Sequence, residues 1–386
     1  MKKGDNMNDY IENNKKNFNL YVFLSTFSRG LIEVFIGTIL YKNGFNLKQV
    51  ILYYLLVNII SLLLTKPFIT LSKKTSNRVL AIIGIISFIL LQIVLNIIKP
   101  KILYLLLVSF LFATYRRGYW MSRRFYNLKT IQKKNISTSY TLISIVNQIA
   151  VVISSYIGAL LLDFISIKIL TIISISLFII SILPLYKLKF THEYNNEKLD
   201  LFKTMKQIGF GNIYLFSSYE LLNVIKFLFP LYIFIYVKNT YQIIGLLALI
   251  QSIATILFSY IYGRIINKDK NFLSISILLI IIVYIFKANT TGVILCIMSF
   301  LEGITTKMHE ISINKNFYTL SKKFEYYNYN YVYEFTQNLL RTLVLVICYF
   351  FINDIKKMIY LCLFVQLIGT LFNFKIDNKK DYEVKE

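Results

Sequence analysis

Apolar stretches of about 20 residues alternate with short polar segments along almost the whole chain. A helix rises 1.5 Å per residue, so about 20 residues span a hydrocarbon layer roughly 30 Å thick. Lipid offers the backbone no hydrogen-bond partners, and each stretch must therefore satisfy its own N–H and C=O groups as a helix. The alternation predicts an all-α membrane protein that crosses the bilayer about twelve times.

Composition leaves little of the chain for anything besides helices. Of the 386 residues 56% are hydrophobic, and the mean hydropathy of +0.59 is too high for a typical soluble domain. The sequence has no phosphate-binding Gly loop, no HExxH or GxSxG motif and no cluster of Cys and His. Its three cysteines fall inside apolar stretches without CxxC spacing, as packing residues do. We therefore expect no enzyme, no cofactor and no metal site.

The net charge of +24 is distributed unevenly between the two sets of connecting segments. The connections on the side of the N-terminus carry 27 Lys and Arg residues, and those on the opposite side carry 9. By the positive-inside rule, both termini are cytoplasmic in a multi-pass protein of the cell membrane. The basic segments then face anionic lipid. We expect the lipid bilayer, and no nucleic acid, as the partner of these charges.

Six apolar stretches precede the longest polar segment and six follow it. We expect a cytoplasmic tail at 1–18, a six-helix half at 19–186, a cytoplasmic linker at 187–210, a second six-helix half at 211–376 and a cytoplasmic tail at 377–386. This organisation predicts two halves related by an internal repeat. The expected helices are 19–41, 50–70, 79–98, 102–121, 138–163, 165–186, 212–237, 242–263, 271–288, 290–308, 331–353 and 356–376.

Short basic turns follow the second helix of each half. The first copy begins at Phe68 and contains Ser72, and the second begins at Gly263. Taken alone, the two turns are better explained by simple topogenic charge. The positions of interest are Lys73, Lys74, Gly263, Asn267 and Lys268.

With these two turns, the chain resembles transporters of the major facilitator superfamily over residues 19–376. That family has a loop of the form Gly-x-x-x-Asp-(Arg/Lys)-x-Gly-(Arg/Lys) between helices 2 and 3, often repeated between helices 8 and 9. Gly263 and Lys268 match the second copy, with Asn267 at the Asp position, whereas the first copy has Phe68 and Ser72 in place of Gly and Asp. The resemblance implies alternating access between two halves, and a loop whose charged contacts stabilise one conformation.

Aromatic and charged residues on helices 4 and 11 extend this resemblance to poorly characterised transporters of low-GC bacteria. The family resemblance also implies that helices 1, 4, 7 and 10 line a central cavity. The residues that carry the narrower match are Tyr119, Trp120, Tyr333, Glu334, Phe335, Asn338 and Arg341.

Charged residues inside the membrane are costly, at about 2.5–3.5 kcal/mol each on insertion scales, so each needs a partner or a wet cavity. Most of them here fall on the four helices named above. We place four near cytoplasmic helix ends, where their side chains can snorkel: Lys66, Arg116, Arg117 and Lys307. The others lie deeper: Arg29, Glu33, Glu220, Lys226, Glu302 and Arg341.

Glu33 is the first candidate for a proton carrier. Arg29 precedes it by four residues, so the two side chains share a helix face and can pair. Burial favours the neutral acid and the arginine favours the carboxylate, so a change of geometry between two states can move a proton. A permanent ion pair that only fixes the helix is the alternative. Glu302 and Glu220 are the next candidates.

We read the chain as a secondary active transporter that moves a small solute by alternating access and couples it to protons. Arg29 and Arg341 would pair with the acids or with the solute, and we expect a monomer. Two alternatives stay open: a flippase or exporter of an amphipathic lipid or peptide, and a non-transporting immunity or sensing protein on a transporter scaffold. Substrate and direction are open as well, because one fold carries many functions.

Overall fold

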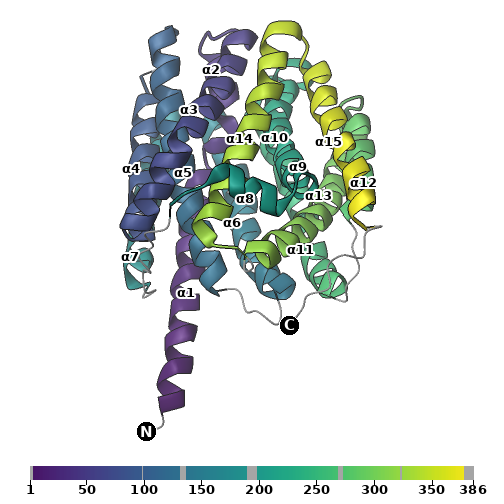
Figure 1. Ribbon diagram of the computed structural model, residues 1–386. Helices are drawn as coiled ribbons and strands as arrows, with labels where there is room; N and C mark the ends of the chain where they lie inside the picture. Colours follow the sequence, from purple (N-terminus) through teal and green to yellow (C-terminus); the bar gives the residue numbers. More distant parts are fainter. Residues whose placement is uncertain are drawn as a thin grey trace.

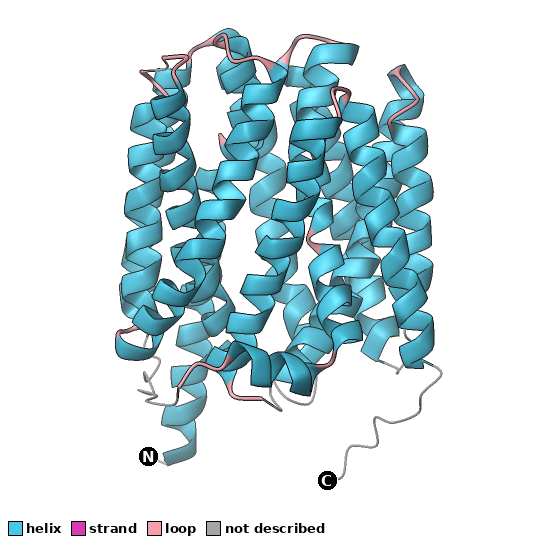
Figure 2. Cartoon of the chain, turned by 45° about the horizontal axis from the view of Figure 1, so that its top comes forward, coloured by secondary structure: helices cyan, strands magenta, loops and turns pink. Residues whose placement is uncertain are grey.

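The computed structural model describes residues 3–97, 99–130, 136–188, 198–267, 273–321 and 324–377. Within these ranges the chain forms helices joined by short turns, without a strand (Figure 2). The predicted all-α class is confirmed. The helices stand side by side, and α1 begins on the same side of the molecule on which α15 ends (Figure 1). We call this the terminal side.

The first half contains six membrane-spanning segments, of which the first is interrupted. Asn46 and Gln49 form a reciprocal capping box at the start of the second span, and the Ser166 side chain caps the sixth. The helices are α1 (Lys3–Gly30), η1 (Glu33–Phe35), α2 (Ile36–Lys42), α3 (Leu47–Lys74), α4 (Asn77–Val94), α5 (Ile102–Thr130), α6 (Ile136–Phe164) and α7 (Ile167–Lys187).

The second half repeats this arrangement, again with an interrupted first span. Its helices are α9 (Phe210–Tyr219), α10 (Leu221–Tyr232), η2 (Ile233–Val237), α11 (Tyr241–Asn267), α12 (Leu273–Lys287), α13 (Gly292–Ser321), α14 (Tyr326–Phe351) and α15 (Ile355–Asp377). The linker expected at 187–210 contains one further helix, α8 (Leu201–Ile208), capped by Asp200. In Figure 1 this helix lies across the bundle, roughly perpendicular to the spans.

Among the described residues, seven helices are long and apolar enough to cross a membrane by themselves, and the apolar Leu273–Lys287 is shorter. The remaining spans, such as α5 and α14, carry several charged side chains. Large apolar side chains point outward; Leu103 is 75% exposed and Phe351 79% exposed. Such side chains suit a surface that faces lipid. The fold is that of a multi-pass membrane protein with twelve spans.

Three helix ends differ most from the sequence-based expectation. The tail expected at 1–18 is already helical from Lys3, as part of α1. Helix α5 continues from the expected end at 121 to Thr130, and α13 continues from 308 to Ser321. The hydropathy pattern predicted earlier ends for α5 and α13, because the last parts of both helices are rich in polar and charged residues. Those residues face other protein segments and the interior, so the helix continues where the apolar pattern stops.

The two halves meet mainly along two pairs of helices. Helix α3 packs against α14, and α6 packs against α11 and, less extensively, against α13. Between α6 and α11 the backbones approach closely, because a Cβ atom on Gly245 would lie 2.5 Å from the Cβ of Ala159. Small residues commonly permit such approaches between membrane helices. Near the side opposite the terminal side, α10 also contacts α2 and η1.

Candidate functional site

A cavity of about 430 Å³ lies between the two halves. Its walls come from α1, η1, α5 and α6 of the first half and from α9 to α14 of the second. Seven basic and five acidic side chains line it, which is a dense set of charges for the interior of a membrane protein. They are Arg29, Arg116, Arg117, Arg124, Lys226, Lys287, Arg341, Glu33, Glu220, Glu302, Glu310 and Glu334.

The first span of each half is interrupted beside this cavity. Helix α1 ends at Gly30, and Glu33 opens the 3₁₀ turn that follows. In the second half, Glu220 stands between α9 and α10. Pro230, which lacks a backbone donor, then precedes the π-helical turn η2. Interrupted helices at matching places in two repeats commonly mark the binding site of a transporter fold.

Glu33 forms an ion pair with Arg29 on its own span. The distance from Nε of Arg29 to Oε2 of Glu33 is 3.1 Å. The Arg29 guanidinium also lies 4.9 Å from the centre of the Trp120 ring, a cation–π contact. The Glu33 side chain is 17% exposed and lines the cavity. Within the described residues, this carboxylate has one ion-pair partner, and its other side opens onto the cavity.

Glu302 has more polar partners than Glu33 and is more deeply buried. It pairs with Lys287 and accepts hydrogen bonds from the Tyr284 hydroxyl (2.5 Å) and from Nε2 of Gln251 (2.8 Å). Its side chain is only 3% exposed. All three partners belong to α11 and α12, which lie in the same half as α13. The cluster is thus internal to one half.

Replacing Lys287 with methionine should destabilise the protein strongly, because Glu302 would remain buried without its cation. We expect a loss of about 3 kcal/mol, as when one member of a buried ion pair is removed. The double variant Lys287→Met/Glu302→Gln should recover most of this loss. Thermal unfolding of the two variants and the wild type, purified in detergent, measures the difference. Equal midpoints for wild type and Lys287→Met would contradict the pairing.

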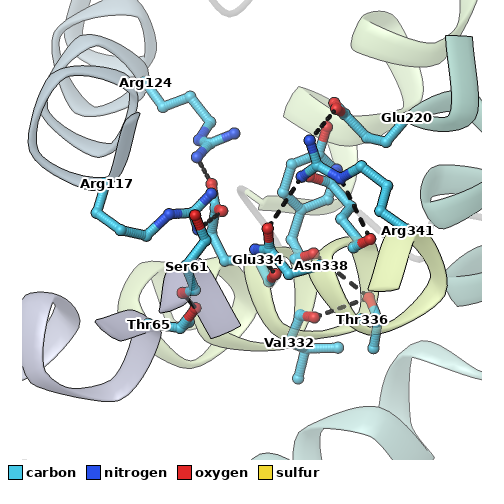
Figure 3. A network of polar contacts seen from close by, with 12 residues as sticks. Ser61, Thr65, Arg117, Arg124, Glu220, Val332, Glu334, Thr336, Asn338 and Arg341 are labelled. Carbon is cyan, nitrogen blue, oxygen red and sulfur yellow. Dashed lines mark hydrogen bonds and ion pairs between the residues drawn. The ribbon is translucent and has the colours of Figure 1, made fainter. Parts of the chain in front are cut away.

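Glu334 joins the two halves. It lies on α14 and pairs with both Arg117 and Arg124 on α5 (Figure 3). Its side chain is 1% exposed. Further along α14, Nη1 of Arg341 lies 3.5 Å from Oε2 of Glu220 (Figure 3). A buried carboxylate between two arginines of the opposite half is a strong electrostatic link in a medium of low dielectric constant.

Two basic side chains that line the cavity do not belong to the ion pairs described above. Arg116 is 7% exposed, and its Nη1 atom is buried without a hydrogen-bond partner. Lys226 of α10 is exposed and lines the same cavity. In the part of the chain that the structure describes, neither residue has an acidic side chain within 4.0 Å.

Three residues expected near helix ends lie in the interior instead. Arg116 and Arg117 occupy the middle of α5, and Lys307 the middle of α13, because both helices extend beyond their expected ends. Lys307 is fully buried, 3.1 Å from Glu310 and in contact with Ser144 of α6. The snorkelling interpretation is therefore wrong for these three. Lys66 is exposed and lies outside the cavity lining.

The aromatic pair on α5 is divided between two environments. Trp120 lines the cavity. Tyr119 is fully buried and directs its hydroxyl to Ser25 of α1 at 3.1 Å. It also accepts a hydrogen bond from Nη1 of Arg123 at 3.1 Å. Tyr119 thus ties α5 to α1 within the first half rather than facing a solute.

The last turn of α3 contacts the other half. The Tyr327 hydroxyl of α14 donates to the backbone carbonyl of Ser72 at 3.5 Å, and Nζ of Lys73 lies 6.0 Å from the Tyr327 ring centre. Lys74 is exposed. In the second copy, Gly263 and Asn267 fall at the end of α11, where side chains lie outside the described part, and Lys268 lies outside the described residues.

Several residues of the site escaped the sequence analysis. Lys287 stands at the end of an expected helix, where a lysine ordinarily reaches the headgroups. Arg123 and Arg124 lie beyond the end of the helix expected at 102–121. The structure shows that all three are interior residues, because α5 is longer than expected and α12 directs Lys287 inward. The uncharged lining residue Gln251 carries no sequence signal of its own in a helix that is otherwise apolar.

Comparison with known proteins identifies the fold. No protein-family model and no curated protein matches the sequence. Among solved structures, a bacterial homologue of the iron transporter ferroportin in an outward-facing state matches with a TM-score of 0.67 and 10% identity, covering 95% of this chain and 100% of that chain. The E. coli fucose:proton symporter matches at 0.65 and 12%, covering 92% of this chain and 97% of that one.

A third match is the human organic anion transporter MFSD10, with a TM-score of 0.65 and 9% identity over 94% of this chain and 99% of that chain. These neighbours are transporters of the major facilitator superfamily. The fold is therefore the one that the sequence resemblance implied, with twelve spans in two six-helix repeats.

Proposed function

We propose that this protein is a secondary active transporter that carries a small solute across the cell membrane by alternating access, coupled to protons. The observation that carries the proposal is the charged cavity between two six-helix halves, beside interrupted helices in each half. The basic terminal side is proposed to be cytoplasmic, in keeping with the positive-inside rule. The fold of the neighbours supports the transport class, and the fucose symporter is an example with proton coupling.

Contacts between the halves on both sides of the cavity support alternating access. Towards the terminal side, Asn127 of α5 donates to the Tyr318 hydroxyl of α13 at 3.2 Å. Towards the other side, Phe35 packs edge-on against Tyr241, with ring centres 5.7 Å apart. Rocking of the halves can break one of these layers while keeping the other. The solute then reaches the cavity from one side at a time.

Glu33 is the proposed proton carrier, because it lies at a helix break, at the cavity and beside the opposite half. It belongs to η1, which contacts α10 of the opposite half, and it opens onto the cavity. Each candidate acid pairs with a basic side chain of its own half: Glu33 with Arg29, Glu302 with Lys287 and Glu220 with Arg341. Glu33 has the most exposed side chain of the three, at 17% against 3% for Glu302 and 13% for Glu220. A proton moves only where the balance between burial and ion pairing changes between states.

Glu33→Gln should abolish solute-driven proton movement while leaving solute exchange in place. The amide keeps the shape of the side chain and its contact with Arg29 but cannot take up or release a proton at neutral pH. Proteoliposomes with a pH-sensitive dye inside measure proton entry, and labelled solute in the same vesicles measures exchange. We expect proton flux to fall at least tenfold.

Glu220→Gln is the matched control, because it removes a carboxylate of the same cavity at the other helix break. It should reduce the rate without uncoupling protons from solute. Proton flux that persists in Glu33→Gln but disappears in Glu220→Gln would make Glu220, between α9 and α10, the carrier. Solute movement without protons in the wild type would leave a uniporter. A protein that moves no solute would favour the non-transporting alternative.

The density of charge in the cavity weighs against a flippase of apolar lipid chains. Such a protein needs an apolar wall that accepts acyl chains, whereas twelve charged side chains line this cavity. Each would lose hydration beside an acyl chain, at a substantial cost in free energy. We therefore favour a polar solute of moderate size.

A further inference from the structure

The ion pairs of the cavity leave a surplus of positive charge. Each of the five lining carboxylates has a basic partner: Glu33 with Arg29, Glu220 with Arg341, Glu302 with Lys287, Glu334 with Arg117 and Arg124, and Glu310 with Lys307. Glu334 has two arginine partners, so that group is already one positive charge in excess. Within the described residues, Arg116 and Lys226 add two more, because no carboxylate lies within 4.0 Å of either.

Of the two basic groups without a carboxylate nearby, Arg116 is the buried one. Only 7% of it is exposed, and its Nη1 has no partner. Glu33 and Glu220 act on it electrostatically, but each is already paired with another arginine. A buried guanidinium without an anion costs several kcal/mol. A protein keeps such a group where an anion arrives to neutralise it.

The surroundings of Arg116 and Lys226 also suit an organic ligand. Trp120, Tyr219 and Phe227 line the same cavity and supply aromatic walls. The volume of about 430 Å³ lies in the range of pockets for small organic molecules. A guanidinium binds a carboxylate or phosphate through two parallel hydrogen bonds, and an ammonium adds a point charge.

We propose that the transported solute is a small organic anion, whose carboxylate or phosphate binds Arg116 in a cavity where Lys226 adds further positive charge. This assignment rests on the proposed transport function and names its substrate class. The surplus charge also predicts discrimination: a neutral analogue leaves Arg116 unpaired, and a cation is repelled. The aromatic walls receive the remainder of the solute.

Trp120 offers a direct test, because it is the only tryptophan of the chain and lines the cavity. Selective excitation of this residue in the purified protein reports occupancy. We would titrate benzoate and phenyl phosphate as anionic probes, and benzamide and benzylamine as neutral and cationic analogues of similar size. Saturable quenching by an anion, at least tenfold tighter than by its analogues, is the expected result. Comparing the two anions distinguishes carboxylate from phosphate.

The variants Arg116→Gln and Lys226→Gln should each weaken anion binding at least tenfold, and Arg116→Lys should recover part of it. Lys66→Gln is the matched control, because Lys66 is an exposed lysine outside the cavity lining. It should bind like the wild type. Thermal unfolding checks that each variant is folded. If neither benzoate nor phenyl phosphate quenches Trp120 saturably, or if Arg116→Gln binds them unchanged, the anion assignment is overturned.

Transport separates this inference from the proposed function. Uptake of a neutral or cationic solute by the wild-type protein in proteoliposomes, unaffected by Arg116→Gln, would overturn the anion assignment while leaving the transporter in place. Anion binding without uptake into proteoliposomes would support the anion site and overturn the proposed transport function. Anion uptake that is lost in Arg116→Gln supports both.

Discussion

Glu334→Gln should be among the most destabilising single substitutions in this protein. It leaves Arg117 and Arg124 buried beside each other without the carboxylate that both contact. The side chain of Arg117 is 3% exposed and that of Arg124 15%, so water screens the repulsion poorly. Removing one member of a buried pair typically costs about 3–5 kcal/mol. We expect low yield and a fall in the unfolding midpoint of about 5–10 °C in detergent.

A triple variant tests whether charge is the cause. Arg117→Gln/Arg124→Gln/Glu334→Gln removes all three charges together and should be clearly more stable than Glu334→Gln alone, because no buried ion is left unpaired. Glu325→Gln is the control on the same helix, since Glu325 caps α14 through the backbone N–H groups of Tyr327 and Asn328. It should cost about 1 kcal/mol. A triple variant as unstable as Glu334→Gln would show that the link acts through shape instead of charge.

The same link has a conformational role in the proposed cycle. Glu334 and its arginines connect α14 to α5, and thus one half to the other. If the halves separate on the terminal side, this pairing has to break. The free energy of this ion pairing therefore contributes to the lifetime of the state that is closed on the terminal side. Single arginine variants should keep the fold through the remaining partner and open that side more often.

The sequence was sufficient for the architecture because the bilayer imposes a single rule on every span. A stretch of apolar residues of the right length must be a helix. This rule located the spans and the six-plus-six division before any three-dimensional information, whereas the cytoplasmic side, assigned from the Lys and Arg counts, stays a prediction. The rule missed the breaks in the first and seventh spans and the ends of two long helices. There, in α5 and α13, polar residues continue the helix inside the protein rather than in water.

The sequence predicted many of the charged residues of the site, but it did not predict which of them form ion pairs. Sequence reasoning placed Glu33, Glu220 and Glu302 inside the membrane, and only the Arg29–Glu33 pair could be inferred, because its partners are four residues apart. Glu334 and Arg117 are separated by 217 positions. Such a contact depends on how the two halves pack, which no local pattern encodes.

Gly118→Val should prevent α4 and α5 from packing in their observed arrangement. A Cβ atom on Gly118 would lie 2.4 Å from the carbonyl oxygen of Leu80 and 3.0 Å from Cα of Gly84. Gly84 faces it in turn, since its own Cβ would lie 2.7 Å from the backbone N of Tyr119. Both obstacles are backbone atoms of a neighbouring helix and cannot rotate away. We expect a loss of about 3 kcal/mol or more, measured as yield and unfolding midpoint.

Gly369→Ala is the matched control, because the nearest atom to its added Cβ is the Ser218 hydroxyl oxygen at 2.9 Å, the end of a small side chain that can turn. This variant should stay close to wild-type stability. Gly118 also lies between Arg117 and Tyr119, so displacement of α5 moves Arg116, Arg117 and Trp120 relative to the cavity. Gly118→Ala adds the same Cβ atom, so it should also lower the stability, and the protein that folds should show weakened anion-dependent quenching of Trp120. Unchanged stability and binding in that variant would mean that the α4–α5 contact does not set the position of α5.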